Sequence, residues 1–254
     1  MPRFAANLSM MFNEWSFLDR FAAAADAGFK AVEFLFPYDH PADAVGRALD
    51  EARLTQALFN LPPGDWQAGE RGMAAIPGRE AEFADTLTTA LPYIEATRVG
   101  RVHMMAGIAP RTPAHAATYR DNAARAADLL GARGVNVLLE PLNPRDMPGY
   151  YLGDFGMATA LIEELGRPNL RLQFDCYHRQ ILHGDMTMAL RALLPVTDHV
   201  QIASVPSRNE PDGEEVNYPF VFAELDRLAF AGYVGCEYRP RAGTLEGLRW
   251  MTNA

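Results

Sequence analysis

The sequence is poor in the residues that mark nucleic-acid binding proteins and disulfide-stabilised proteins. Lys30 is the only lysine among 23 basic residues, and the formal net charge is −9. Proteins that bind nucleic acids usually gather many Lys and Arg side chains on one face, so we expect no nucleic-acid partner. Cysteine occurs only at Cys176 and Cys236, which is typical of buried free thiols in a reducing compartment and argues against a disulfide.

Long apolar segments are absent as well. The sequence contains no run of about 18 apolar residues, and residues 1–15 do not combine a cationic region with a long apolar stretch. We therefore expect a cytoplasmic protein without a membrane partner. The first strand candidate is not followed by a G-x-G-x-x-G motif, which argues against a dinucleotide-binding fold.

What the sequence does contain is a regular alternation of short apolar segments and longer helical ones. Its 254 residues fit one (β/α)8 barrel, for which about 250 residues are usual. No linker-like change of composition divides the chain, so we predict an α/β fold with a single TIM barrel domain over residues 1–254. The predicted strands are residues 3–9, 31–36, 54–61, 101–106, 135–140, 170–175, 199–204 and 233–237. The predicted helices are residues 16–27, 41–53, 80–96, 113–133, 155–165, 180–194, 220–231 and 246–251.

Oxygen-bearing side chains mark four of these strands. Apolar runs stop at Glu140, Asp175 and Glu237, and Gln201 lies on the seventh strand candidate. The carboxyl ends of barrel strands form one rim, so we expect these side chains to meet there. Neighbouring carboxylates repel one another unless protons or a cation neutralise them. Because oxygen ligands favour Mg²⁺ or Mn²⁺ over zinc, the pattern predicts a divalent metal site.

Two further features point to the same rim. His178 lies three residues beyond Asp175, where it can polarise a substrate, whereas His103 is more typical of a core histidine. Residues 62–79 form a long loop for a compact domain, and loops of that length often cover a site. We interpret the segment as an active-site lid with Trp66 as its apolar cover, an ordinary surface loop being the alternative.

The chain resembles the hydroxypyruvate isomerase family of xylose isomerase-like TIM barrels over essentially its whole length. The most specific signal is NLPPGDWQAGERGMAAIPGRE at 60–80, because the patterns in LLEPLN at 138–143 and QFDCYH at 173–178 occur more widely in the superfamily. The other matching stretches are RFAANLSMMF at 3–12, GFKAVEFLFPYD at 28–39 and GCEYRP at 235–240.

The resemblance implies reversible isomerisation of hydroxypyruvate and 2-hydroxy-3-oxopropanoate, with Glu140 and Glu237 as the acid/base pair. It also implies a divalent metal, Mg²⁺ or Mn²⁺, bound by Glu140, Asp175, Gln201 and Glu237. Related sugar epimerases have a histidine where this chain has Gln201, so the need for a metal stays open. One glutamate would remove a carbon-bound proton to give a cis-enediolate, and one would return it to the adjacent carbon.

The substrate carboxylate requires a cation. Arg208 and Arg71 are the candidates from the sequence, because an arginine can bind a carboxylate through two parallel hydrogen bonds. For both residues, a solvated place on the surface is the alternative.

Other functions remain open. A four-carbon 2-oxo-tetronate isomerase or a ketose 3-epimerase would use the same enediolate chemistry. Metal-dependent cleavage of damaged DNA occurs in the same superfamily, although the negative charge and the single lysine argue against it here. A non-catalytic protein that binds sugar acids would need no acid/base pair. If the protein forms a homo-oligomer, we expect a dimer.

Overall fold

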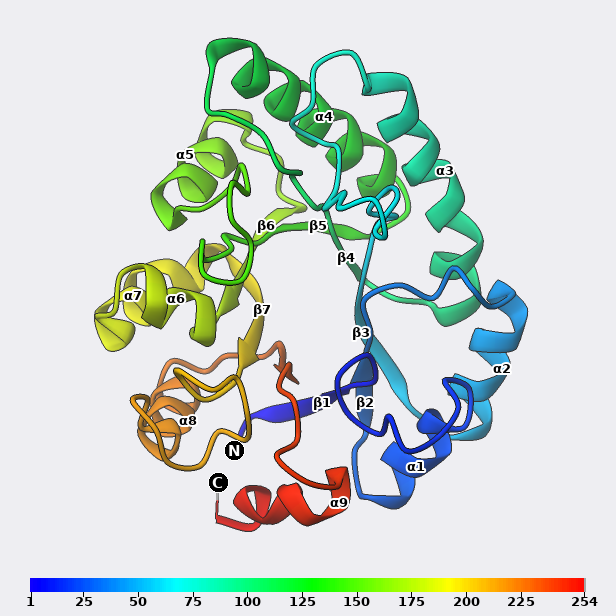
Figure 1. Cartoon of the computed structure of the whole chain (residues 1–254), viewed down its shortest axis with the longest axis vertical. Coiled ribbons are helices and arrows are strands. Elements are labelled where there is room, and N and C mark those ends of the chain that lie inside the picture. The colour runs from blue at the N-terminus through cyan, green and yellow to red at the C-terminus, as the bar shows by residue number, and fades with distance from the viewer. Residues whose placement is uncertain (254) are drawn as a thin grey trace.

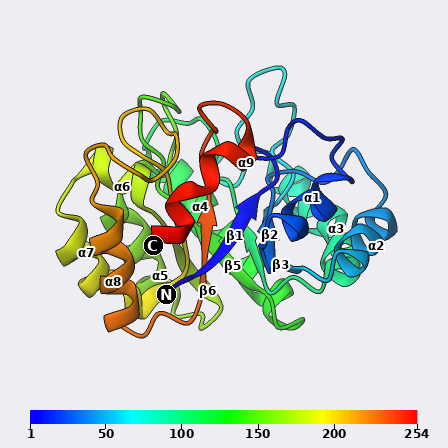
Figure 2. The same cartoon turned by 90° about the horizontal axis from the view of Figure 1, so that it is seen from below.

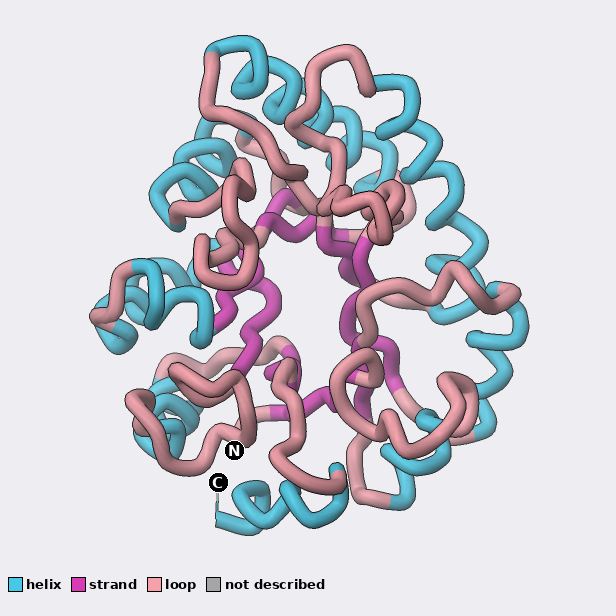
Figure 3. The backbone as a smooth tube through the Cα atoms, viewed as in Figure 1, coloured by secondary structure: helices cyan, strands magenta, loops and turns pink. Residues whose placement is uncertain are grey.

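The fold is built around a closed barrel of eight parallel strands that pair in chain order, with β1 joined to both β2 and β8. The computed structural model describes residues 1–253. Figures 1 and 3 show the strands as an inner ring that the helices surround. The strands are β1 Arg3–Asn7, β2 Ala31–Glu33, β3 Thr55–Asn60, β4 Arg101–His103, β5 Asn136–Leu139, β6 Leu170–Asp175, β7 Thr197–Ile202 and β8 Tyr233–Cys236.

Helices connect the strands and cover the outside of the barrel. Each crossover returns the chain to the same end of the sheet, as parallel pairing requires. The predicted α/β fold with a single TIM barrel is therefore confirmed. The helices are α1 Arg20–Asp26, α2 Ala42–Glu51, α3 Glu80–Thr97, α4 Pro113–Gly131, α5 Phe155–Leu165, α6 Cys176–Leu182, α7 Met186–Leu193, α8 Tyr218–Arg227 and α9 Thr244–Gly247, with 3₁₀ helices η1 Leu194–Val196 and η2 Leu248–Asn253.

Aromatic side chains hold the start and the end of the chain together. Phe4 of β1 packs edge-on against Phe222 of α8 and Trp250 of η2, with ring centroids 5.1 and 5.0 Å apart. Edge-to-face pairs of this kind add about 0.5–1.5 kcal/mol to the gain from burial alone. This packing joins β1 to α8 and η2, the elements before and after β8 in the chain, and β1 pairs with β8 itself.

The pairing register brings the predicted rim residues to one level. Asp175 of β6 pairs with Gln201 of β7, and Gln201 pairs with Gly235 of β8, two residues before Glu237. Parallel strands in register present equivalent positions side by side. Residues from three strands, separated by up to 62 positions in the sequence, therefore face a common centre.

The sixth helix differs from its prediction. A single helix over 180–194 was expected, but α6 begins at Cys176 and a second helix, α7, begins at Met186. The early start has a local cause, because the Asp175 carboxylate accepts a hydrogen bond from the Tyr177 backbone N–H at 2.7 Å and caps α6. Gly184 and Asp185 break the helix with positive φ angles of 58° and 49°.

The loops after the strands gather at one end of the barrel. Figure 2 shows the loops that follow β1, β3 and β7 rising on the same side of the strands. In (β/α)8 enzymes this carboxyl end holds the active site. Every helix within residues 1–253 is too short or too polar to cross a membrane.

Candidate active site

The loops at the carboxyl end of the barrel enclose a cavity of about 140 Å³. This is small for a ligand site, since roughly 300–1,000 Å³ is common for drug-sized ligands. One part of its wall is apolar and includes Leu35, Phe36 and Trp66. Its polar lining consists of Asn60, His103, Glu140, His178, Arg208, Glu237 and Arg239.

Glu237 lies just beyond β8 and is held through both carboxylate oxygens. Arg208 donates from Nη2 to Glu237 Oε1 at 2.6 Å, and Gln201 donates from Nε2 to Glu237 Oε2. Arg208 also donates from Nη1 to Asp146 Oδ2 at 2.9 Å, and its guanidinium lies over the Tyr177 ring. With only 7% of its surface exposed, Arg208 gives the cavity a buried positive charge whose main partner is Glu237.

Glu140 faces the same cavity from the end of β5 but has fewer partners. Its Oε1 has no hydrogen-bond partner among the described residues, and Oε2 lies 3.5 Å from His103 Nδ1. Both ring nitrogens of His103 also lack partners within residues 1–253. Buried polar atoms are rarely left unpaired. Unpaired atoms on two facing side chains indicate a place where a polar ligand binds.

His178 presents a hydrogen-bond donor to the cavity. Its Nδ1 accepts hydrogen bonds from the Asn143 backbone N–H at 3.1 Å and from Asn143 Nδ2 at 2.8 Å. The Asn143 amide orientation is fixed because its Oδ1 accepts from the backbone N–H groups of Arg145 and Asp146. Nδ1 is therefore the unprotonated nitrogen of a neutral ring, and Nε2 carries the proton, as inferred from this network.

Asp175 shares its two oxygens between the fold and the cavity. Oδ1 caps α6, whereas Oδ2 is buried without a hydrogen-bond partner in the described chain and lies 3.6 Å from His178 Nε2. Glu140, Asp175 and His178 each have an atom within 4.8 Å of the others, a grouping that could hold a metal ion. The free oxygens of Glu140 and Asp175 fit a cation that prefers oxygen ligands.

Gln201 contributes differently from the prediction that it binds metal through its oxygen. Its Nε2 faces the carboxylates of Glu33 and Glu237, while its Oε1 accepts a hydrogen bond from Gln173 Nε2 at 2.6 Å. Only the amide nitrogen can donate to two carboxylates, so this orientation follows from the network. Gln201 therefore acts in this structure as a link between Glu237 and the barrel interior.

Below the cavity the barrel interior is polar. Glu33 accepts hydrogen bonds from Asn7 Nδ2 at 2.9 Å and Gln201 Nε2 at 2.9 Å, and it lies 2.6 Å from His199 Nε2. Gly235 makes room for this carboxylate, since a Cβ atom at that position would lie 2.2 Å from Glu33 Oε2. The network fixes Gln201 and, through it, one oxygen of Glu237.

Burial changes the acidity of the site residues. It raises the pKa of Glu237 to about 8, against the opposing effect of Arg208, and that of Asp175 to about 6. Burial together with Glu237 and Asp175 raises the pKa of Glu140 well above its usual value. Burial, Arg208 and His103 lower the pKa of His178, which stays neutral. Carboxyl groups with raised pKa values are candidates for proton transfer at neutral pH.

The predicted lid places Trp66 in the wall of the cavity at this end of the barrel. Trp66 packs against Phe36 with ring centroids 5.3 Å apart. Arg71 also contacts Trp66: its guanidinium carbon lies 3.7 Å from the centroid of the Trp66 ring, and its Nη1 donates a hydrogen bond to the Trp66 backbone oxygen. Arg71 thus supports Trp66, and its predicted contact with the substrate stays a prediction.

The lid docks on the barrel through Gly72, which gives a first prediction. Gly72 has φ +98°, and a Cβ atom there would lie 2.3 Å from the Met105 backbone oxygen. We expect Gly72→Ala to undock the lid, to speed tryptic cleavage after Arg71, and to lower kcat/KM by about tenfold or more because Trp66 moves. Gly69→Ala is the matched control, since Gly69 has φ +94° but nothing within 4 Å of its Cβ position. Equal effects of both substitutions would contradict this explanation.

The structure thus brings Glu140, Asp175, His178, Arg208, Glu237 and Trp66 together at one end of the barrel. Three contributors were missed by sequence reasoning. His103 was interpreted as a core residue, Asn143 fixes the tautomer of His178, and Arg239 lines the cavity. The available signals were the position of Asn143 in the EPLN stretch and that of Arg239 two residues after Glu237, but neither reveals a contact.

Comparisons with known proteins agree on the fold, and the two sequence relatives named below are isomerases. The profile of a family described as xylose isomerase-like TIM barrel matches residues 21–254. The chain is 56% identical to a 2-oxo-tetronate isomerase of Cupriavidus necator, over 99% of this chain and 98% of the relative. It is 42% identical to a hydroxypyruvate isomerase of Escherichia coli, with the same coverage. A crystal structure from Brucella melitensis, described as AP endonuclease, family 2, is 51% identical with a TM-score of 0.97 and covers 100% of this chain and 99% of its own.

Proposed function

The chain belongs to the xylose isomerase-like TIM barrel family and is an isomerase, and from that premise we propose that it isomerises a short 2-oxo-3-hydroxy acid through a cis-enediolate. The observation that carries the proposal is the pair of buried glutamates, Glu140 and Glu237, both with raised pKa values, at the same small cavity. Interconversion of a 2-oxo-3-hydroxy acid and its 3-oxo-2-hydroxy isomer needs one group that accepts a carbon-bound proton and one that donates a proton.

We assign proton removal from C3 to Glu237. Its carboxylate form is stabilised by hydrogen bonds from Arg208 and Gln201, so it is the more readily ionised of the two glutamates. The electron pair of the broken C3–H bond forms the C2–C3 double bond, and negative charge moves to the oxygen on C2. Glu140, which burial keeps protonated, then delivers a proton to C2, which takes up the electron pair of the C2–C3 double bond. The proton of the C3 hydroxyl passes to the negative oxygen on C2, which becomes the new hydroxyl group, and C3 is left as a carbonyl.

Two hydrogen-bond donors, one neutral and one cationic, stabilise the negative oxygen. The Nε2–H of His178 points into the site, and the Nε–H of Arg208 is buried without a hydrogen-bond partner among residues 1–253. Preorganised donors at a developing oxyanion lower the barrier because they need no reorganisation during the reaction. A neutral imidazole suits this role, because it carries no charge that would attract the substrate carboxylate.

A divalent cation has a place in this proposal. Mg²⁺ or Mn²⁺ would be held by the free oxygens of Glu140 and Asp175, with Glu237 as the third ligand expected from the sequence, and would supply Lewis-acid polarisation of the substrate oxygens. Trp66 and the lid exclude water from the cavity and so protect the enediolate from side reactions.

The two candidate substrates share the reacting unit. Hydroxypyruvate, the substrate expected from the sequence, and 2-oxo-tetronate both carry a carboxylate, a 2-oxo group and a 3-hydroxyl group, and they differ only by a hydroxymethyl group on C3. We place the four-carbon acid first, because the identity to the 2-oxo-tetronate isomerase, at 56%, exceeds that to the hydroxypyruvate isomerase, at 42%. The formal net charge of −9 and the single lysine argue against DNA cleavage.

The direct test is turnover of both acids by the purified protein, with the 3-oxo product followed by a coupled reductase. We expect measurable turnover of both and the higher kcat/KM for 2-oxo-tetronate. The assay is repeated after chelation and after readdition of Mg²⁺ or Mn²⁺, to determine whether a cation takes part. A folded, cation-supplied protein that converts neither acid would overturn the proposal.

The pH dependence of the reaction follows from Glu237. Since the pKa of Glu237 is raised to about 8, the carboxylate form of the free enzyme becomes scarcer as the pH falls below that value. We expect kcat/KM to rise about tenfold per pH unit up to about pH 8 and then to level off. A rate that is constant from pH 6 to 8 would mean that the base keeps the ordinary acidity of a glutamate.

A further inference from the structure

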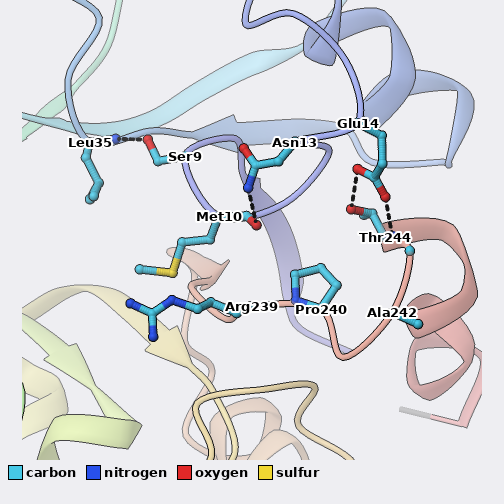
Figure 4. A pocket seen from close by; sticks show the side chains of 10 residues that line it. Ser9, Met10, Asn13, Glu14, Leu35, Arg239, Pro240, Ala242 and Thr244 are labelled. Carbon is cyan, nitrogen blue, oxygen red and sulfur yellow. Dashed lines mark hydrogen bonds between the residues drawn. The ribbon is translucent and has the colours of Figure 1, made fainter.

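A second, larger cavity adjoins the catalytic one. It has a volume of about 730 Å³ and lies between the loops that follow β1 and β8. Met10, Leu35 and Arg239 line both cavities. Figure 4 shows the Arg239 side chain extending alongside Met10, on the far side of Pro240 from Ala242 and Thr244. Arg239 therefore lies where the two cavities meet.

The other polar side chains of the outer cavity are committed to the protein. Ser9 Oγ accepts a hydrogen bond from the Leu35 backbone N–H at 2.8 Å, and Asn13 Nδ2 donates to the Met10 oxygen at 2.8 Å. The Glu14 carboxylate accepts from Thr244 (Figure 4). The Arg239 guanidinium, in contrast, forms neither a hydrogen bond nor an ion pair with any described residue, although its backbone does.

The charge of the catalytic cavity makes this free cation significant. An anionic substrate must enter a space that already contains Glu140 and Glu237. The positive charge of Arg208 is shared among Glu237, Asp146 and, at 3.9 Å, Asp175, so it offsets charges of the protein itself. Arg239 is the remaining cationic side chain in the lining of the catalytic cavity, and its charge is available to a ligand.

The backbone of Arg239 is held in place even though its side chain is free. Its N–H donates to the Arg208 oxygen at 2.9 Å, and its carbonyl oxygen accepts from Asn209 Nδ2 at 2.8 Å. The strand end that carries Glu237 is therefore tied to the loop that carries Arg208. A guanidinium on a fixed backbone can bind a carboxylate with two hydrogen bonds at a modest cost in entropy.

We propose that Arg239 binds the substrate carboxylate at the junction of the two cavities, an inference that rests on the proposed function. The bound acid then has its carboxylate toward the outer cavity and C2 and C3 toward Glu140 and Glu237. Its C3 substituent lies in the smaller, inner space, which admits hydrogen or a hydroxymethyl group and excludes longer chains. Arg208 is left to stabilise the oxygens of the reacting carbons.

The test compares Arg239→Gln with the wild-type protein. We expect KM for hydroxypyruvate and 2-oxo-tetronate to rise roughly 10- to 100-fold with little change in kcat, the loss typical of one charged hydrogen-bonded contact. Arg239→Lys keeps the charge but lacks the second parallel hydrogen bond, and we expect an intermediate KM. A five-carbon 2-oxo-3-hydroxy acid should be a poor substrate of the wild-type protein, because its longer substituent would have to enter the inner cavity.

The matched control is Arg145→Gln, which removes one positive charge from an exposed arginine after β5 that lines neither cavity. An unchanged KM for Arg239→Gln, or an equal rise for Arg145→Gln, would overturn the assignment. Efficient turnover of the five-carbon acid would overturn the orientation, because it would place the substituent in the outer cavity.

Calorimetric binding of D-glycerate separates this inference from the proposed function. Glycerate has the carboxylate but no carbonyl group to isomerise, so its binding does not depend on catalysis. We expect its Kd to rise with Arg239→Gln by the same factor as KM, and glycerol to bind the two proteins equally. Loss of glycerate binding in a protein that converts neither acid would refute the isomerase substrates while keeping the carboxylate site. Unchanged glycerate binding alongside wild-type turnover would refute the role of Arg239 alone.

Discussion

Glu237→Gln lowers kcat for the 2-oxo acid by about 10²- to 10⁴-fold, the range that general acid–base catalysis supplies, and Glu140→Gln does the same. Each substitution keeps the size of the side chain and removes the ability to exchange a proton. Because Glu237 and Glu140 act on different carbons in our proposal, the two variants differ in a second measurement, the exchange of the C3 hydrogen with deuterated water.

In that experiment Glu140→Gln continues to wash deuterium into C3, since Glu237 still forms the enediolate, but it yields little isomer. Glu237→Gln shows neither exchange nor isomerisation. Glu140→Gln should have the unfolding temperature of the wild-type protein or a higher one, because it removes a carboxyl group from a crowded, buried site. Glu237→Gln should have a lower one, because it removes the charged partner of the buried Arg208. The opposite pattern of exchange would reverse the two roles, and full turnover by both variants would exclude the acid/base pair.

Arg208→Met has the second large effect, on stability as well as on rate. The substitution leaves Glu237 and Asp146 without their shared partner, and breaking a buried ion pair from one side costs about 3–5 kcal/mol. The penalty depends on pH. Without the guanidinium the pKa of Glu237 rises further, so the folded state resists ionisation and stability is lost as the pH rises.

Urea unfolding at pH 6 and pH 9 measures this effect. We expect the deficit of Arg208→Met to be larger at pH 9, where Glu237 of the wild-type protein is ionised and Glu237 of the variant resists ionisation. The deficit should be smaller at pH 6, below the pKa of Glu237 of about 8, where Glu237 is protonated in both proteins. We also expect kcat/KM to fall by at least about 10²-fold, as for the loss of an oxyanion donor. Arg145→Met, on the same rim but exposed, should change neither quantity. A deficit that is independent of pH would mean that Arg208 contributes packing rather than charge.

The fold was predictable because its signals are local. The apolar runs that end at Glu140 and Asp175 identify two strands and place these carboxylates at the strand ends. The alternation of strands and helices along the chain is compatible with only a few sheet topologies. The break between α6 and α7 was not predictable from periodicity, since it depends on Gly184 and Asp185 adopting positive φ angles within a helical pattern.

The site was only partly predictable, because a residue's role there depends on its orientation. The sequence places Gln201 at the rim, but only the surrounding network determines that its nitrogen faces Glu237 and its oxygen faces Gln173. His178 was recognised from its distance to Asp175 along the chain, whereas its tautomer depends on the loop residue Asn143. Such contacts between distant segments leave no pattern in a single sequence.

The two carboxylate oxygens of Asp175 have different roles, and this limits how Asp175 can bind a cation at the rim. Its Oδ1 is engaged as the cap of α6, and its Oδ2 alone faces the cavity. Asp175 can therefore act as a monodentate ligand but not as a chelating one unless the first turn of α6 loses its cap. A cation held by a single oxygen of Asp175 would exchange more readily than one held by both, so the helix cap itself weakens the grip of this rim on a metal ion.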